Sequence, residues 1–224
     1  MLDYEYFMNQ LTKKSHYENK SLNYGVSHTR LKRILSLLGR KSKQRVLEVG
    51  CASGRLGREI KKLGHYVAGI EISESAAAQA KKVLDKVYVF DVESEWSADI
   101  LSQKFDLVIL SEILEHVFDP VYVLKKSSAV LKPAGEIILT TPNFLTWTNR
   151  FRFLFGFFKY EREGMFDFGH IRWFTYPYLK KVLAESGFTI TNEKHIIFPG
   201  KLTKILKLWP SLFVRQFVVK AKKQ

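Results

Sequence analysis

The sequence contains one cysteine in 224 residues, Cys51, and therefore cannot form an internal disulfide. Such low cysteine usage is typical of a reducing compartment. Long hydrophobic runs are also absent, since the apolar stretch Phe151–Phe158 is far shorter than the ~20 residues that cross a bilayer. The first ten residues carry Asp3 and Glu5, where a secretory signal would have basic residues and then an apolar stretch. We therefore expect a cytoplasmic protein that at most lies on a membrane surface.

Acidic residues are scarce at both ends of the chain. Residues 1–44 carry nine Lys/Arg and three Asp/Glu, a net charge of +6, and residues 144–224 carry fifteen and five, a net charge of +10. Residues 45–143 carry twelve and fourteen, a net charge of −2. Basic flanks favour a negatively charged partner, such as a nucleic acid, an anionic small molecule or an acidic lipid surface, or they form a solvated surface. Composition does not decide between these interpretations.

Short apolar segments alternate with helical patterns through the middle of the chain, and no repeat or Pro/Gly-rich linker interrupts them. This alternation indicates βαβ units and a parallel sheet. The length suits one domain. We predict an α/β, doubly wound, mostly parallel seven-stranded sheet with an antiparallel last strand. The predicted strands are Arg45–Val49, Tyr66–Glu71, Lys86–Phe90, Phe105–Ser111, Glu136–Thr141, Phe188–Ile197 and Phe213–Lys220.

Three further segments complete the predicted organisation. Residues 1–44 are expected to form a helical cap, with its clearest helix at Thr29–Leu38, before a main domain at 45–224. Residues 143–173 are aromatic and basic without a clean period, so we expect an insertion that covers the carboxyl edge of the sheet. Ser73 and Asp119 are expected helix N-caps, and Gly187 is an expected left-handed C-terminal cap.

A glycine-containing turn, Gly50–Gly54, joins the first predicted strand to its helix. In an open α/β sheet such a turn contacts the ligand at the carboxyl ends of the strands. A dinucleotide fingerprint G-x-G-x-x-G would need glycine at Ala52 and at Arg55. Glu48 adds a carboxylate beside the turn, which suits an ammonium or sulfonium ligand and would repel a pyrophosphate. The turn therefore favours S-adenosylmethionine over a dinucleotide.

Polar residues follow the next three predicted strands. Glu71 is placed to accept hydrogen bonds from ribose hydroxyls, and Asp91 is placed to receive an adenine amino group. Ser111 and Glu112 end the fourth strand, where a methionine moiety would reach. Each could be an ordinary surface residue alone, but four such positions after consecutive strands predict one ligand site.

The motifs VLEVGCASG, GIEIS, FDV, FDLVILSEILEHVFDP and LKPAGEIILTTPN resemble, in order and spacing, those of class I S-adenosylmethionine-dependent methyltransferases. The resemblance covers roughly residues 40–190, and GHIRWFT followed by LKKVLAESGF is similar to small bacterial members of the ubiquinone-pathway and methionine-biosynthesis-like groups. Ala52 stands where the family motif has a second glycine and still belongs to the implied site. The resemblance implies these cofactor contacts: Glu48, Gly50 and Gly54 at the methionine moiety, Glu71 at the ribose, Ile72, Asp91 and Val92 at the adenine, and Ser111 closing the pocket.

Methyl transfer needs alignment of donor and acceptor, and a base where the acceptor must lose a proton. His116 and His170 are the candidate catalytic bases near the strand edge, with a structural role as the alternative for each. Glu112, Glu115, His116 and His170 also resemble the metal-binding tetrad of small-RNA 2′-O-methyltransferases and a cluster in ubiquinone-pathway O-methyltransferases. The resemblance therefore leaves a divalent metal open as a second cofactor.

The acceptor side is indicated by aromatic residues interleaved with Arg150, Arg152 and Lys159 within residues 147–159. This pattern has three interpretations. The aromatic residues could pack on the sheet, form a pocket for a large apolar or lipid-linked acceptor, or make peripheral membrane contact together with residues 201–209. Nucleic acid is less favoured, because no basic run is dense.

The leading hypothesis is methyl transfer to a small-molecule acceptor, hydroxyl-bearing and hydrophobic or lipid/glycan-linked. RNA methylation and a non-catalytic cofactor-binding protein that uses its basic flanks as an interaction surface are the alternatives.

Overall fold

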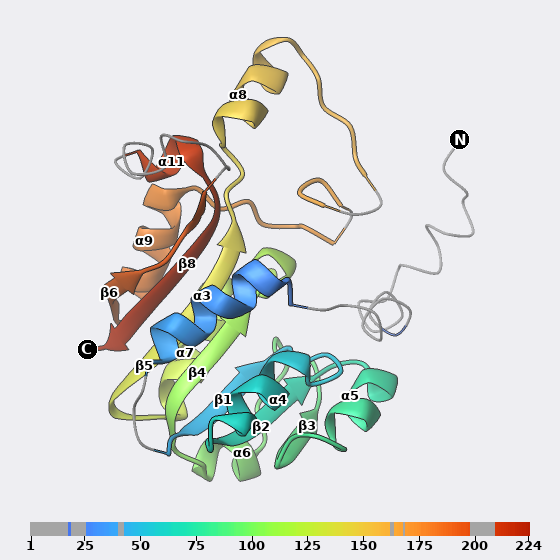
Figure 1. The fold of residues 1–224 in the computed structure, drawn as a ribbon, viewed down its shortest axis with the longest axis vertical. Coiled ribbons are helices and arrows are strands. Elements are labelled where there is room, and N and C mark those ends of the chain that lie inside the picture. Colours follow the sequence, from blue (N-terminus) through green and yellow to red (C-terminus); the bar gives the residue numbers. More distant parts are fainter. Residues whose placement is uncertain (1–17, 19–25, 40–42, 162–163, 168, 198–208) are drawn as a thin grey trace.

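A computed structural model describes residues 18, 26–39, 43–161, 164–167, 169–197 and 209–224 of the chain (Figure 1). One mixed sheet runs through the described molecule in the strand order β3-β2-β1-β4-β5-β8-β6, with β7 paired to β8. Strands β1 to β5 are mutually parallel, and β8 is antiparallel to β5, β6 and β7. The strands are β1 Arg45–Val49, β2 Tyr66–Glu71, β3 Lys86–Val89, β4 Phe105–Ser111, β5 Leu131–Pro142, β6 Phe188–Glu193, β7 Ile196–Ile197 and β8 Val214–Lys223.

Helices cover both faces of the sheet, which confirms the doubly wound class. Alternate strand residues bury on opposite faces, so Val46 joins a core under α3 and α4 while Leu47 joins the core under α7 and α9. The described helices are α3 His28–Leu38, α4 Arg55–Lys62, α5 Glu74–Ala80, α6 Ala98–Ser102, the 3₁₀ turn η1 Leu114–His116, α7 Pro120–Ala129, α8 Trp147–Leu154, α9 Tyr176–Glu185 and α11 Pro210–Phe213.

The predicted helix caps are present. Ser73 Oγ accepts the backbone N–H of Ala76 at the start of α5, and Asp119 Oδ1 accepts that of Tyr122 at the start of α7. Gly187 has φ 78° after α9, the left-handed conformation expected of a C-terminal cap. These three helix ends therefore lie where local sequence signals place them, whereas β5 begins five residues before the expected Glu136.

The predicted strand Phe188–Ile197 is two strands in the structure. The pairing of β6 with β8 shifts register between Ile190 and Asn192, and the chain then pairs again as β7. The sheet consequently has eight strands instead of seven. The last strand is antiparallel as predicted, and its bounds are three residues longer at the carboxyl end than the expected Phe213–Lys220.

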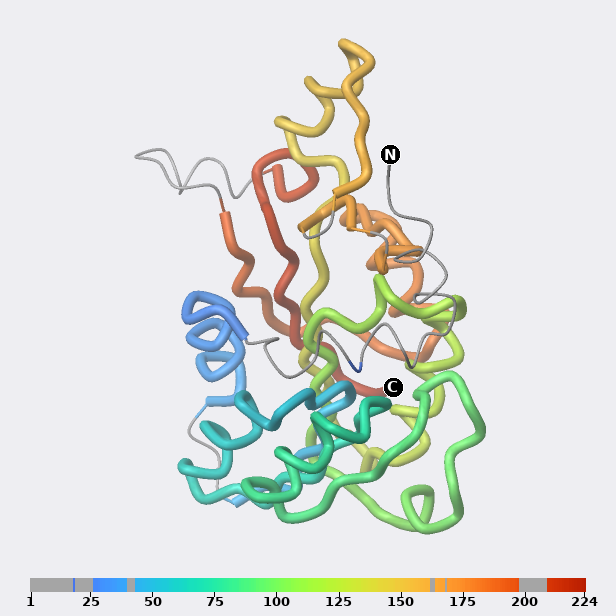
Figure 2. The backbone as a smooth tube through the Cα atoms, turned by 90° about the vertical axis from the view of Figure 1, so that its right-hand side faces the viewer, coloured from blue at the N-terminus to red at the C-terminus, as the bar shows by residue number. Residues whose placement is uncertain are grey.

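The amino-terminal region and the aromatic insertion are described in part. α3 confirms the helix expected at Thr29–Leu38 and packs over β5 and β8, with Lys220 Nζ donating to Leu37 O at 3.1 Å and lying 2.9 Å from Glu136 Oε2. Most of residues 1–25 and the segment 198–208 lie outside the described residues. Within the insertion, α8 and the chain after it project from the carboxyl edge of the sheet (Figures 1 and 2). Among the described helices, none has the length and apolar character needed to cross a membrane.

Candidate active site

The turn between β1 and α4 is built from residues with left-handed backbone. Gly50, Ala52 and Gly54 have φ 69°, 46° and 79°, and Gly54 N donates to Cys51 O at 2.8 Å to close the turn. A Cβ on Gly50 would lie 2.1 Å from Ile113 Cδ1, so glycine there serves a close approach as well as its φ. Ala52, the departure from the family motif, adopts a conformation that glycine adopts more readily. Alanine at this position therefore adds backbone strain, while the turn keeps its left-handed conformation.

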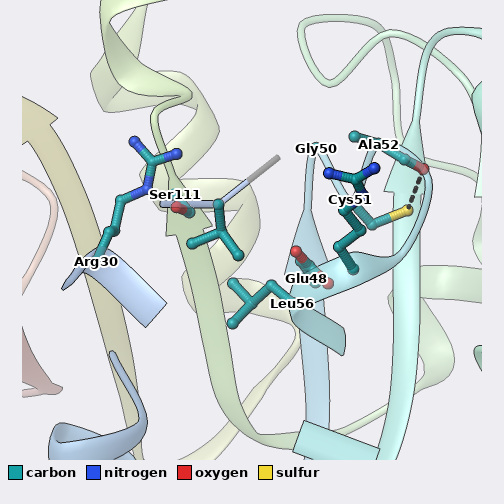
Figure 3. A pocket seen from close by; sticks show the side chains of 9 residues that line it. Arg30, Glu48, Gly50, Cys51, Ala52, Leu56 and Ser111 are labelled. Carbon is teal, nitrogen blue, oxygen red and sulfur yellow. Dashed lines mark hydrogen bonds between the residues drawn. The ribbon is translucent and has the colours of Figure 1, made fainter. Parts of the chain in front are cut away.

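The turn forms one wall of a pocket that also receives side chains from α3 and β4 (Figure 3). Its open space, including the part continuous with solvent, is about 330 Å³. The lining includes four of the predicted cofactor residues together with five others. They are Glu48, Gly50, Ala52 and Ser111 from the prediction, and Val26, Arg30, Cys51, Arg55 and Leu56 in addition.

Glu48 is the acidic group of this pocket. Its side chain is 4% exposed, and Oε2 accepts no hydrogen bond. Burial raises the pKa of the Glu48 carboxyl to about 8, with the backbone of Gly57 acting in the opposite direction and Glu71 adding a smaller increase. A buried acid with an unused oxygen is suited to a cationic ligand group, because the cation would restore the charged form.

Arg30 is the buried basic residue of the same pocket, which the exposed Arg55 also lines, and the sequence patterns did not single Arg30 out. Its guanidinium approaches Glu112 with Nη1 3.1 Å from Oε2, while its buried Nε has no hydrogen-bond partner. In Figure 3 it enters from the α3 side, across Ser111 from Glu48. A signal was present: Arg30 shares the helical face of Ile34 and Leu37, at spacings of four and seven residues, and so lies on the buried side of α3.

Glu71 lies at the end of β2, as predicted, and supports the turn. Its Oε2 accepts the N–H of Ala52 at 2.8 Å, and its Oε1 accepts the N–H of Ser73 at 2.9 Å. Burial raises the pKa of Glu71, while these backbone donors act in the opposite direction. The carboxylate therefore ties the turn to the start of α5, and its placement as a ribose ligand stays a prediction.

The remaining predicted adenine contacts follow β2 and β3 at the same edge. Ile72 and Val92 are half-buried, and Val92 O accepts the indole N–H of Trp96. Asp91 Oδ1 accepts the N–H of Glu93 at 3.0 Å, in a short turn after β3. The structure thus brings the predicted residues of all four strands to one edge, although Gly54, Glu71, Ile72, Asp91 and Val92 lie outside the pocket lined by Glu48 and Arg30.

A second cluster lies beside the carboxyl end of β4. Glu115, His116 and His170 present ligand atoms that all lie within 4.8 Å of one another. Glu115 is 1% exposed and neither carboxylate oxygen has a hydrogen-bond partner, so burial, with the nearby Glu112 charge second, raises its pKa well above the usual range. Glu112, the fourth residue of the predicted metal set, instead pairs with Arg30 and accepts Thr140 Oγ1 at 2.8 Å.

The two histidines of this cluster are oriented by backbone carbonyls. His116 Nδ1 lies 2.8 Å from Gly169 O, and His170 Nδ1 lies 2.9 Å from Met165 O. A carbonyl can only accept, so each Nδ1 carries the proton and each Nε2 is the basic atom. The ring centroids are 4.6 Å apart, which joins two residues 54 positions apart in the sequence. The arrangement can take a proton or hold a cation.

The chain matches a family model described as a methyltransferase domain over residues 24–193. A ubiquinone biosynthesis O-methyltransferase of Coxiella burnetii is 34% identical over 121 residues, 53% of this chain and 51% of that protein. The protein of the same name from Bradyrhizobium diazoefficiens is 29% identical over 159 residues, 69% of this chain and 62% of that protein. The chain thus spans about half the length of the first of these relatives.

Solved structures with the same fold include a possible histamine N-methyltransferase from Thermotoga maritima, with TM-score 0.62, 19% identity and coverage of 99% of this chain and 98% of that one. Magnesium protoporphyrin IX methyltransferase from Synechocystis, solved with bound SAH, gives TM-score 0.62 at 14% identity, with coverage of 99% and 100%. These identities show the fold alone. The family match, over most of the chain's length, confirms the resemblance found in the motifs: the chain belongs to the class I S-adenosylmethionine-dependent methyltransferases.

Proposed function

We propose that this chain transfers the methyl group of S-adenosylmethionine to a hydroxyl oxygen of a small hydrophobic or lipid/glycan-linked acceptor. The observation that carries the proposal is a pocket with one buried carboxyl group, Glu48, and one buried guanidinium, Arg30, each with a polar atom that has no hydrogen-bond partner. An amino-acid group has an ammonium and a carboxylate to match them. When bound, S-adenosylmethionine supplies an activated methyl group on a sulfonium.

The residues of the chain have separate tasks in this proposal. Glu48 and Arg30 fix the amino-acid end of the donor, and the Gly50–Gly54 turn fits closely beside it. The basic Nε2 atoms of His116 and His170 are suited to accept the acceptor's proton. Because displacement at the methyl carbon needs an in-line approach, alignment by these walls is the main contribution of the protein.

An oxygen acceptor with an apolar part is supported by two features. The two curated relatives described above are named ubiquinone biosynthesis O-methyltransferases. The insertion that brings His170 to His116 also carries aromatic side chains, of which Phe144 and Trp173 stack at 4.8 Å. An apolar acceptor would find aromatic surface on the same insertion that carries His170.

The proposal is tested by binding and then by transfer. Calorimetry with S-adenosylhomocysteine is expected to show one site per chain, and labelled methyl from S-adenosylmethionine is expected to enter an organic-solvent extract of cells. Absence of binding would refute S-adenosylmethionine as the methyl donor. Label that appears only in RNA would refute a small hydrophobic or lipid/glycan-linked molecule as the acceptor.

Arg30 provides a sharper prediction. Arg30→Met is expected to weaken S-adenosylhomocysteine binding by about thirtyfold or more, since removing one member of a buried charge pair costs roughly 2–5 kcal/mol. Methylthioadenosine, which lacks the amino-acid group, should bind both proteins equally. Glu112→Gln is the matched control, because it removes the ion pair with Arg30 but leaves the guanidinium in place. Equal losses for both ligands would show that Arg30 only supports the fold.

The Glu115 cluster fits a divalent cation, because two carboxylate oxygens are buried without a partner beside two imidazoles. Glu115, His116 and His170 would hold such an ion, which would lower the pKa of an acceptor hydroxyl. If the reaction uses it, chelation is expected to abolish methyl transfer and leave S-adenosylhomocysteine affinity unchanged, and Glu115→Gln should do the same. Full activity after chelation, with no metal found by elemental analysis, would exclude this role.

A further inference from the structure

The exposed apolar side chains of the described residues gather on one projection. Of fourteen exposed large hydrophobic residues, seven lie between Trp147 and Tyr160. These residues belong to α8 and the chain that follows it, which extends away from the sheet in both views (Figures 1 and 2). Apolar residues scattered singly over a surface are ordinary, whereas a contiguous group on a projection marks an interaction site.

The large apolar residues of this region include two sets. One set makes ring contacts within the insertion: Phe153 and the partly exposed Phe158 contact Phe166 with ring centroids 5.8 and 5.4 Å apart, and Phe144 contacts Phe153 at 5.3 Å. This set holds the projection in place against the body of the insertion. The other set is exposed, and we call it the outward set: Phe151, Leu154, Phe155 and Phe157. The outward set is therefore carried by a packed base and not by a loose loop.

The charge around the outward set has one sign. Residues 143–160 contain Arg150, Arg152 and Lys159 and no acidic residue. Arg150 Nε donates to Leu145 O at 2.9 Å, and Arg152 lies 3.6 Å from Glu161, the next acid along the chain. Apolar side chains flanked by cations match the boundary between headgroups and acyl chains in an anionic bilayer.

We propose that the outward set inserts into the surface of a bilayer containing anionic phospholipids, with Arg150 and Lys159 against the headgroups. A second copy of the chain is a poorer occupant, because a symmetric contact would bring the same cations together. The insertion begins at the end of β5 and returns through His170, so docking by its tip would turn the candidate site toward lipid. The proposal does not depend on methyl transfer.

The test is co-sedimentation with vesicles of phosphatidylcholine and phosphatidylglycerol, compared with phosphatidylcholine alone. Leu154 and Phe157 are 77% and 65% exposed, and the double variant Leu154→Gln/Phe157→Gln is expected to lower partitioning at least about tenfold. Lys159→Gln is expected to lower it about fivefold on the anionic vesicles and little on neutral ones. Leu63→Gln is the matched control. Leu63 is 56% exposed and follows the C-terminal end of α4, away from the outward set.

Three results would overturn the proposal. The wild-type chain could fail to sediment with either vesicle, or the double variant could bind as well as wild type. Sedimentation velocity without lipid could also show a dimer that the double variant abolishes, which would assign the outward set to self-association. Thermal unfolding and circular dichroism unchanged from wild type would show that a loss of binding in the double variant is not a loss of fold.

Discussion

Glu48→Gln is expected to stabilise the ligand-free protein in mildly alkaline solution while it destroys the donor site. The ordinary pKa of a glutamate carboxyl is 4.5, and the pKa of Glu48 in the folded chain is about 8. At a pH where the folded and unfolded states are both protonated, the wild-type carboxyl does not lower the stability of the fold. As pH rises through the window between those values, the folded state holds the extra proton and stability falls. The loss of unfolding free energy reaches its full size above about pH 8, and its upper limit is about 5 kcal/mol. Glutamine has no proton to lose, so the variant should escape this loss.

Urea unfolding near pH 5 and near pH 9 measures the effect. The gain from Glu48→Gln should be small at the acidic pH and several kcal/mol at the alkaline one. Glu59→Gln on α4 is the control, because Glu59 is partly exposed and paired with Lys62. Parallel pH profiles for wild type and Glu48→Gln would show that the buried carboxyl is not held neutral.

The same substitution should weaken donor binding. S-adenosylhomocysteine affinity is expected to fall by about thirtyfold or more, for a lost buried charge contact of roughly 2–5 kcal/mol. Since the ligand ammonium would ionise Glu48, wild-type binding near pH 7 should release a proton, and the variant should not. Calorimetry in two buffers with different ionisation enthalpies detects that proton. An unchanged affinity would remove Glu48 from the site.

Much of this architecture could be predicted because its signals are local. The alternation of strands and helices, the caps at Ser73 and Asp119 and the glycines at 50 and 54 each depend on a few neighbouring residues. Arg30 was also within reach, since its spacing from Ile34 and Leu37 marks a buried face. The neighbouring Lys32 and Arg33 are exposed, so the local run of basic residues by itself indicates a solvated surface and hides the buried position of Arg30.

Other features depend on contacts that no local pattern encodes. The register shift within β6 after Ile190 and the separate pairing of β7 both depend on β8, which lies more than 20 residues further along the chain. The resemblance grouped Glu112 with Glu115 as possible metal ligands, but Glu112, which has a positive φ of 59°, pairs with Arg30 from α3. Phe153 and Phe155 are the same residue type in the same segment, so hydrophobicity alone does not predict that Phe153 packs on Phe166 while Phe155 is exposed.

The catalytic role of the histidine pair can be separated from a structural role by asparagine. In His116→Asn and His170→Asn the amide nitrogen can replace Nδ1 as the donor to Gly169 O or Met165 O, but no basic nitrogen remains. If one histidine is the base, its variant should lose about 10²–10⁴ in kcat, while S-adenosylhomocysteine affinity stays within about twofold. Where the chelation test has excluded a metal ion, the larger loss identifies the base, because the loss of a metal ligand would lower kcat in the same way. If both variants keep kcat within about threefold, the pair only orients the insertion, because a donor to the carbonyl would then be all that the fold requires.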